Sequence, residues 1–325
     1  MTKNELRIVF MGTPEFAVGT LKRLVEENYN VVAVVTQPDK PVGRHQTSLQ
    51  PSQVKQYALS HDIPVLQPEK MKDSAFLEQL KAYNADLQVV VAFRMLPEEV
   101  WAMPRFGTFN VHAALLPQYR GAAPINWAVI NGEKQTGVTT FFLDHDIDTG
   151  RVIMQEPFVI KDDYNVENVY EGLMRLGADV AVKTVDLIIN GNGHVDSLAQ
   201  DEMISTSSVL LPAPKIYKNT CEIDWKKPSK KIYDFIRGLS PYPGSWTTVV
   251  DGKGKEYVMK IYSSKKTDRL STRELGTFVS DGGSMYVNTI DCQLELSVIQ
   301  LSGKPRIDAC SFINGHDVNS WRIKM

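Results

Sequence analysis

Short apolar segments alternate with amphipathic ones over the first 190 residues. The segments expected to be strands are 6–11, 31–36, 87–92, 108–111 and 138–143. Two longer segments, 16–28 and 165–189, carry apolar residues at helical spacing. Strands that alternate with helices are typical of βαβ units, whose strands are parallel and whose helices cover the sheet. We therefore predict an α/β domain with a Rossmann-like, largely parallel open sheet and helices on both faces.

A long loop and a tight turn stand out within this alternation. Residues 37–51 form a Pro-, Gly- and polar-rich segment, longer than a compact α/β unit usually needs, and such loops often carry function. The turn Gly12-Thr13-Pro14-Glu15 supplies a single glycine where a dinucleotide-binding turn has three, and the chain has no Gly-x-x-x-x-Gly-Lys-[Ser/Thr] motif. A nucleotide cofactor is therefore not expected.

The pattern changes after residue 190. Asn190-Gly191-Asn192-Gly193 ends the long helical segment, and a polar stretch leads to Pro212-Ala213-Pro214. Beyond it lie a basic helical segment, 229–239, and short alternating segments at 246–250, 257–262, 276–279 and 294–301. Such short strands predict a small β-barrel. We expect a catalytic domain (1–190), a linker (191–212) and a second domain (213–325).

The charge distribution changes the first impression given by the composition. The 325 residues are 43% hydrophobic, which is enough for two cores and excludes general disorder. The formal net charge of −2, taken alone, argues against a nucleic-acid partner. Residues 213–325, however, contain 18 basic and 12 acidic residues, a net of +6, which leaves −8 for residues 1–212. The total therefore averages two parts of opposite sign.

Cysteine usage and the N-terminal sequence predict a soluble, cytoplasmic protein. Cys221, Cys292 and Cys310 have no paired short spacing, so neither a disulfide framework nor a zinc knuckle is expected. The first residues lack the features of a signal peptide, and no segment approaches the roughly 18 apolar residues of a transmembrane helix.

The densest group of polar residues follows the strand predicted at 108–111. Asn110 and His112 are two residues apart at the end of this strand, so their side chains share one face. Ligands bind at the carboxyl ends of strands in open α/β sheets. A lone histidine in a strand is more often a core residue, but the Pro-, Gly- and Arg-containing segment 117–124 favours a site here.

A second polar group, residues 144–150, follows the strand predicted at 138–143. Its three aspartates and one histidine admit a solvated acidic loop or a metal site, although zinc sites usually use spaced His and Cys ligands. An inward role is expected for Asp148, which lies between an apolar residue and a Thr-Gly turn. A carboxylate beside His112 would fix the tautomer of the ring and raise its pKa from about 6.5.

These residues suit direct acyl-type transfer. No Gly-x-Ser-x-Gly motif is present, and all three cysteines fall in the second domain, so a covalent intermediate is not expected. In a direct transfer, Asn110 donates to a developing oxyanion, His112 moves protons and Asp148 orients and charges the histidine.

At these residues the sequence resembles the folate-dependent formyltransferases. The likeness is carried by Phe109-Asn-Val-His112, Leu115-Leu-Pro117-x-x-Arg120-Gly-Ala-Ala-Pro124 and Asp148-Thr-Gly150. Within that superfamily, segments 9–17, 36–44, 223–225, 236–237 and 241–246 are similar to the methionyl-tRNA formyltransferases. The resemblance implies that Asn110, His112 and Asp148 are catalytic. It also implies that the formyl group of 10-formyltetrahydrofolate passes, without a metal, to the α-amine of methionine on initiator tRNA.

The resemblance also implies binding residues, a monomer and an OB-like second domain. The folate pocket is expected to use Phe93, Arg94, Met95, Leu96, Ala114, Leu115, Leu116 and Pro117. The tRNA is expected to contact Lys40, Arg44, Lys227, Lys230, Lys231 and Arg237. For residues 93–96 an ordinary strand end, and for the lysines a solvated surface, would explain the same pattern. After Arg44 the chain reads His45-Gln46-Thr47-Ser48 where the family tends to be basic, which weakens the charge of this loop.

Two alternatives stay open from the sequence. A formyltransferase that acts on an amino-sugar nucleotide would keep the same chemistry and change the acceptor, but segment 36–41 and the basic second domain argue against it. A catalytically inactive RNA-binding relative would keep only the fold. The intact Asn110, His112 and Asp148 argue against that interpretation.

Overall fold

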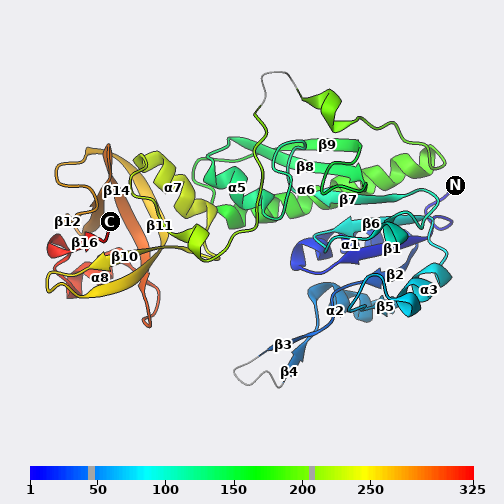
Figure 1. Ribbon diagram of the computed structural model, residues 1–325, viewed down its shortest axis with the longest axis horizontal. Coiled ribbons are helices and arrows are strands. Elements are labelled where there is room, and N and C mark those ends of the chain that lie inside the picture. Colours follow the sequence, from blue (N-terminus) through cyan, green and yellow to red (C-terminus); the bar gives the residue numbers. More distant parts are fainter. Residues whose placement is uncertain (43–47, 205–208) are drawn as a thin grey trace. The chain divides into compact units, whose positions relative to one another are not determined.

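The computed structural model describes residues 1–42, 48–204 and 209–325 and divides into two compact units (Figure 1). Unit 1 consists of residues 1–121, 136–159 and 170–213. Unit 2 consists of residues 122–135, 160–169 and 214–325. Each unit therefore draws on separate stretches of the chain, and the linear boundaries at 190 and 213 stay a prediction.

Unit 1 is built on a seven-stranded sheet with the order β5-β2-β1-β6-β7-β8-β9. Its strands are β1 (Ile8–Gly12), β2 (Val31–Val35), β5 (Val65–Leu66), β6 (Leu87–Val91), β7 (Thr108–His112), β8 (Gln135–Phe142) and β9 (Val152–Val159). The first five strands of this order pair in parallel, and β8 is antiparallel to β7. The predicted Rossmann-like, largely parallel sheet is confirmed.

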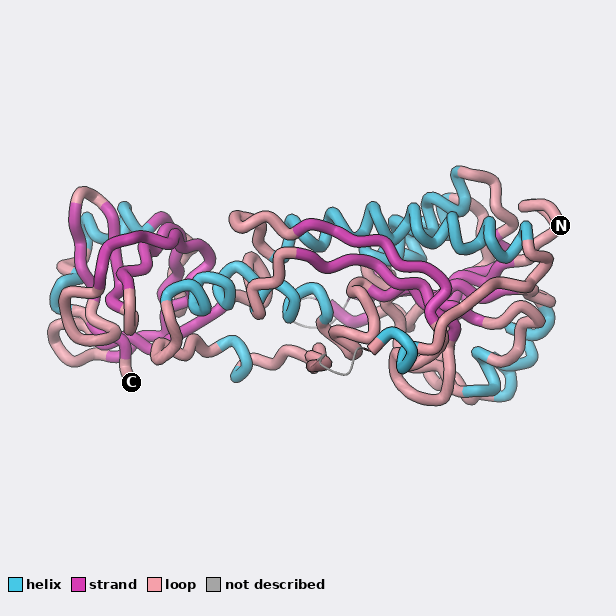
Figure 2. Tube along the Cα trace, turned by 90° about the horizontal axis from the view of Figure 1, so that it is seen from above, coloured by secondary structure: helices cyan, strands magenta, loops and turns pink. Residues whose placement is uncertain are grey.

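Helices cover both faces of this sheet (Figure 2). They are α1 (Glu15–Glu26), α2 (Gln53–Ser60), α3 (Ser74–Ala82), α4 (Glu98–Trp101) and α6 (Val166–Asn190). On one face, Val9 and Met11 of β1 share a buried apolar cluster with Phe76 of α3. On the other face, α6 lies so close that a Cβ at Gly177 would be 3.4 Å from Cγ1 of Val111. Apolar burial on both faces explains why the strands of this sheet are nearly continuous apolar runs.

The segment predicted as a long loop, 37–51, contains two short strands. β3 (Lys40–Val42) and β4 (Ser48–Gln50) pair antiparallel, and the hairpin projects from the rest of unit 1 (Figure 1). The expectation of a loop was wrong here, because backbone pairing forms these strands without the apolar alternation that would reveal them in the sequence.

Unit 2 contains a curled antiparallel sheet with the order β12-β13-β14-β11-β10-β16, and β15 also pairs with β14. Its strands are β10 (Ser245–Val250), β11 (Glu256–Leu270), β12 (Phe278–Asp281), β13 (Ser284–Asn288), β14 (Cys292–Leu301), β15 (Ile307–Asp308) and β16 (Arg322–Ile323). A bridge between Thr277 and Arg322 brings the two edges of the sheet together. This curled sheet agrees with the predicted barrel-like domain.

Three helices accompany the sheet of unit 2: α5 (Pro124–Ile130), α7 (Ser229–Gly238) and α8 (Ala309–Gly315). Ile232 and Ile236 of α7 are buried in one apolar cluster with Met259 of β11 and Leu296 of β14. The helix predicted at 229–239 is confirmed, and its apolar face closes the core of the unit.

Candidate active site

Asn110 and His112 lie near the carboxyl end of β7, in the middle of the sheet of unit 1. Asn110 pairs with Val90 on β6 and with Phe141 on β8. Because the two residues are separated by one position in a strand, their side chains share a face, as predicted. The buried Oδ1 of Asn110 has no hydrogen-bond partner among the described residues. A buried amide oxygen without a partner is costly, so this atom indicates a place where a ligand binds.

The surroundings of His112 fix which ring nitrogen carries its proton. The side chain is 6% exposed, and Nε2 lies 2.9 Å from the carbonyl oxygen of Tyr119. A carbonyl only accepts hydrogen bonds, so Nε2 is the donor and Nδ1 is unprotonated in the neutral ring. Nδ1 lies 3.8 Å from Oδ2 of Asp148. It is therefore the nitrogen that can accept a proton.

Burial lowers the pKa of His112 below its usual value, although the Asp148 carboxylate and the Tyr119 carbonyl both act to raise it. The expectation of a raised pKa was wrong. The carboxylate is near the ring, but removing the imidazolium from water costs more than the carboxylate at this distance restores. His112 is therefore mainly neutral at pH 7 and ready to act as a base.

Asp148 is held in an unusual backbone conformation by contacts around it. Its φ of 55° is uncommon for a residue with a side chain. Its Oδ2 accepts a hydrogen bond of 2.9 Å from the backbone N–H of Gly121. Gly121 has a φ of 127°, and a Cβ there would lie 2.5 Å from the carbonyl oxygen of Ala213. Only glycine fits this position, which gives the Arg-Gly pair of the motif a physical reason.

Sequence reasoning missed Gln200, which also contacts this loop. Gln200 belongs to the short 3-10 helix Gln200–Met203 and donates from Nε2 to the carbonyl oxygens of Asp148 and Gly150, both at 2.8 Å. No motif marks it, because it lies in the segment 191–212 that the composition predicts as a linker.

The first group of predicted folate residues follows β6 after Ala92 and lies outside helix and strand: Phe93, Arg94, Met95 and Leu96. Leu96 is buried in an apolar cluster and Phe93 packs against it. Arg94 donates to the carbonyl oxygens of Glu69, at 2.8 Å, and Pro68. Met95 is 68% exposed. Only part of this segment is therefore occupied by internal packing.

The second group, Ala114, Leu115, Leu116 and Pro117, follows β7, the neighbour of β6 in the sheet. Oγ1 of Thr139 donates to the Ala114 carbonyl at 2.6 Å and accepts from the Leu116 N–H at 3.0 Å. Nε2 of Gln155 donates to the Leu116 carbonyl at 2.7 Å. The structure thus brings both groups to the carboxyl ends of adjacent strands, beside Asn110 and His112.

The acidic group at 144–146 includes His145, whose ring contacts α4. His145 packs edge-on against Trp101, with ring centroids 5.4 Å apart, and its Nδ1 is 3.8 Å from Oε2 of Glu98. Across the described residues, no three His, Cys, Asp or Glu side chains are grouped so that they could hold a metal ion.

Residues 1–42, 48–204 and 209–325 contain no helix that is long and apolar enough to cross a membrane.

Comparison with known proteins decides the family. Residues 6–185 match the family described as formyl transferase, and residues 215–317 match the formyl transferase C-terminal domain. The chain belongs to the formyl transferase family. Asn110, His112 and Asp148 all lie within the first match.

Relatives named for an activity match nearly the whole length of this chain. The methionyl-tRNA formyltransferase of Parabacteroides distasonis is 56% identical, over 97% of this chain and 97% of its own. That of Bacteroides fragilis is 53% identical, over 100% and 99%. That of Porphyromonas gingivalis is 45% identical, over 98% of both chains.

Solved structures share the fold at low identity. HypX from Aquifex aeolicus, in complex with tetrahydrofolic acid, has a TM-score of 0.62 at 16% identity; the match covers 95% of this formyl transferase and 47% of HypX. The sugar 3N-formyl transferase WlaRD has a TM-score of 0.63 at 20% identity, over 92% and 99%. At these identities the likeness concerns the fold alone.

The residues expected to bind tRNA differ in how exposed their side chains are and in whether those side chains are already paired. Lys40 is exposed on β3, and Arg44 lies outside the described residues. Lys227 is exposed, with Nζ 3.9 Å from Oδ2 of Asp224. Lys231 is exposed and donates to the Asn131 carbonyl at 3.1 Å. These contacts are weak enough for the lysines to reach a phosphate.

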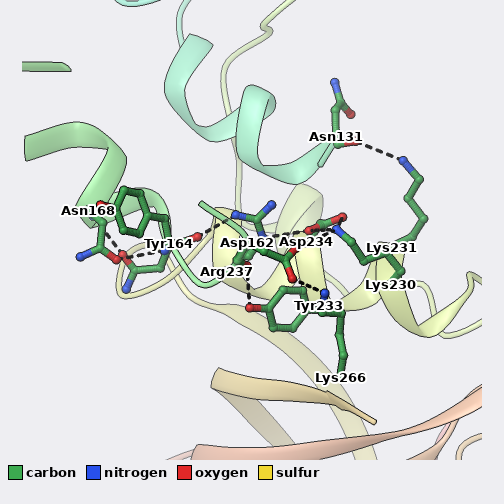
Figure 3. Close-up of polar contacts among 11 residues, drawn as sticks. Asn131, Asp162, Tyr164, Asn168, Lys230, Lys231, Tyr233, Asp234, Arg237 and Lys266 are labelled. Atoms are coloured by element: carbon green, nitrogen blue, oxygen red, sulfur yellow. Dashed lines mark hydrogen bonds and ion pairs between the residues drawn. The ribbon is translucent and has the colours of Figure 1, made fainter. Parts of the chain in front are cut away.

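Lys230 and Arg237 are engaged in an internal network of unit 2 (Figure 3). Nε of Arg237 lies 2.8 Å from Oδ1 of Asp234, and its Nη1 donates to the Tyr164 carbonyl at 2.7 Å. The Arg237 side chain is 7% exposed. Nζ of Lys230 lies 2.7 Å from the same Oδ1 of Asp234. This placement argues against Arg237 as a tRNA contact, because its guanidinium is buried and already paired.

Proposed function

We propose that this protein transfers the formyl group of 10-formyltetrahydrofolate to the α-amine of methionine carried by initiator tRNA. The observation that carries the proposal is identity of 45–56% to proteins named methionyl-tRNA formyltransferase, over nearly the whole of each chain. The geometry around Asn110, His112 and Asp148 supports it independently, since it provides the groups that acyl transfer to an amine requires.

In this transfer, a bond forms between the methionine nitrogen and the formyl carbon, the bond from that carbon to the folate nitrogen breaks, and the amine loses a proton. Nδ1 of His112 accepts that proton and, as the carbon–nitrogen bond to folate breaks, gives it to the departing folate nitrogen, which leaves as a neutral amine. Asp148 stabilises the charged ring, because its carboxylate lies 3.8 Å away. The Asn110 amide donates to the oxygen that gains negative charge, as in an oxyanion hole.

Each substrate is proposed to have its own set of binding residues. The pterin is expected beside segments 93–96 and 114–117, which offer backbone groups and apolar side chains next to Asn110. The tRNA is expected to use Lys40, Arg44, Lys227 and Lys231, with a smaller part for Lys230, whose ammonium already faces Asp234. We further propose that the protein is a monomer and acts in the cytoplasm, where its three free cysteines stay reduced.

The test is a comparison of acceptors. Purified protein with 10-formyltetrahydrofolate is expected to formylate charged methionyl initiator tRNA and to leave a TDP-linked amino sugar unmodified. His112→Ala serves as the control for contaminating activity. Formylation of the sugar nucleotide in place of the tRNA would show that the acceptor is misassigned.

A further inference from the structure

Gln200 is a buried polar residue that makes four hydrogen bonds among the described residues, all directed at one loop system of unit 1. Its exposed fraction is 2%. Oε1 accepts from Nε and Nη2 of Arg120 at 2.9 and 2.7 Å. Nε2 donates to the carbonyls of Asp148 and Gly150 at 2.8 Å. The amide thus connects Arg120, next to Gly121, with the backbone of Asp148.

The segment that carries Gln200 is itself fixed to unit 1. Leu198 forms a bridge with Val152 at the start of β9. Further along the chain, the Tyr119 N–H donates to the Leu211 carbonyl at 2.7 Å, and the Ala213 N–H donates to the Arg120 carbonyl at 2.8 Å. Gln200 therefore approaches Asp148 from a supported backbone and can hold its neighbours in place.

Asp148 needs such support, because its positive φ is strained for a residue with a Cβ. The Gly121 N–H holds the carboxylate, and Gln200 holds the carbonyl of the same residue. Without the second contact, the turn 148–150 is free to relax to an ordinary backbone conformation, and that change would carry the carboxylate away from His112.

We propose that Gln200 is a positioning residue: its side-chain amide connects Arg120 to the Asp148–Gly150 turn and thereby keeps the Asp148 carboxylate beside His112. Residue 200 lies between the two segments matched by the family, 6–185 and 215–317, so neither match assigns it a role. The effect of Gln200 on catalysis rests on the proposed function. Its effect on the position of the Asp148 carboxylate relative to His112 does not.

The experiment replaces the amide with a thioether of similar length, Gln200→Met, and follows His112 by NMR titration in the substrate-free protein. Asp148 is the charged group that raises the His112 pKa, so displacement of its carboxylate is expected to lower that pKa by about 0.5 to 1 unit. The variant Asp148→Asn is expected to shift the His112 pKa in the same direction. In the formylation assay kcat is expected to fall about tenfold, with smaller changes in KM, because the substrates bind elsewhere.

Two further variants separate positioning from general loosening. Gln118→Met is the matched control, because Gln118 also connects its loop to residues 209 and 211 by side-chain hydrogen bonds but does not contact Asp148. It is expected to leave the titration unchanged. The double variant Gln200→Met with Asp148→Asn is expected to be no slower than Asp148→Asn alone, since Gln200 acts through Asp148.

An unchanged His112 titration in folded Gln200→Met, or losses that multiply in the double variant, would overturn the proposal. If Gln200→Met does not fold, Gln200→Glu keeps the acceptor for Arg120, removes the N–H donors, and is tested by the same double-variant comparison. A protein that fails to formylate methionyl-tRNA but still shows the titration shift would contradict the proposed function and leave the positioning role intact.

Discussion

Two carboxylates, the half-buried Asp148 of unit 1 and the buried Asp234 of unit 2, differ in how closely they are paired. Asp234 is 2% exposed and lies within 2.8 Å of both Arg237 and Lys230. Asp148 is 14% exposed and lies 3.8 Å from the His112 ring. The Asp234 carboxylate has its hydrogen bonds made by Arg237 and Lys230 within unit 2. The loose pair leaves Nδ1 of His112 able to exchange a proton, beside an Asn110 oxygen that has no partner among the described residues.

The network around Asp234 extends this contrast (Figure 3). Lys266 forms an ion pair with Asp162, and this contact lowers the pKa of the Asp162 carboxyl. The Tyr233 hydroxyl donates to the Asp162 carbonyl at 2.8 Å. Charges that are paired in this way favour one folded arrangement, whereas a site for chemistry keeps part of its hydrogen-bonding capacity for the substrate.

Removing the His112 ring, which is the base of the His112–Asp148 pair, should have the largest effect on activity. His112→Ala is expected to lower kcat/KM by about a thousandfold, the loss typical of a general base with an electrostatic role. Its melting temperature is expected to fall by a few degrees, because the buried ring leaves a cavity beside Phe141 and, among the described residues, loses one hydrogen bond, to Tyr119. Steady-state kinetics and calorimetry measure the two effects. Near wild-type turnover would mean that His112 does not take the proton.

Removing the Asp234 carboxylate, which is closely paired with Arg237 and Lys230, should instead lower the free energy of unfolding. Asp234→Ala leaves the buried Arg237 guanidinium without its ion-pair partner and is expected to destabilise unit 2 by about 3 kcal/mol. Urea unfolding measures the change. Asp224→Ala is the control, because Asp224 is exposed and 3.9 Å from Lys227, and it should cost under about 0.5 kcal/mol. Equal effects of both variants would contradict the contrast.

The sequence predicted the placement of Asn110 and His112 better than their surroundings. Asn110 and His112 could be placed together because strand alternation is a local rule, and the position of β7 follows from its apolar run. The direction of the His112 pKa could not be predicted, because it depends on how completely the ring is buried. Gln200 had no sequence signal, since its contacts join residues 52 and 80 positions apart.

Unit 2 shows the same limit. The sequence predicts one basic surface on α7, yet Arg237 faces inward to Asp234 and Lys231 is exposed. The sequence alone does not show that Tyr164 and Asp162, about 70 positions earlier, pack against this helix. Composition predicts where charge is rich, and tertiary contacts decide which charges remain available.

The pH dependence of activity should sharpen the comparison. Burial lowers the His112 pKa, so the neutral, proton-accepting form persists as the pH falls below 6.5. Activity governed by His112 is therefore expected to decline only below that value. Asp148 opposes the lowering, so Asp148→Asn should move the acidic limb to still lower pH, by about one unit, in the activity that remains. A shift toward higher pH would contradict the assigned pairing.

The smallest expected effect concerns Asp291, a well-paired carboxylate of unit 2 that contacts α7. Burial acts to raise the pKa of Asp291, but the N–H groups of Ser229 and Cys292 and the Thr289 hydroxyl outweigh it and lower the pKa to about 2. A depressed pKa contributes stability above the unfolded value of about 3.9, and that stability is lost as the pH falls toward 2. Because the residue is exposed, Asp291→Asn is expected to cost only about 1 kcal/mol at pH 7.

Unfolding curves of Asp291→Asn and wild type should therefore converge between pH 4 and pH 2, where the wild-type carboxyl takes up its proton. Formylation of tRNA at pH 7 should be unchanged, because the side chain supports the first turn of α7 through the Ser229 N–H and has no part in the chemistry. A stability difference that is independent of pH would mean that Asp291 acts through packing rather than through its charge. A loss of activity without a loss of stability would remove the distinction between the two kinds of carboxylate.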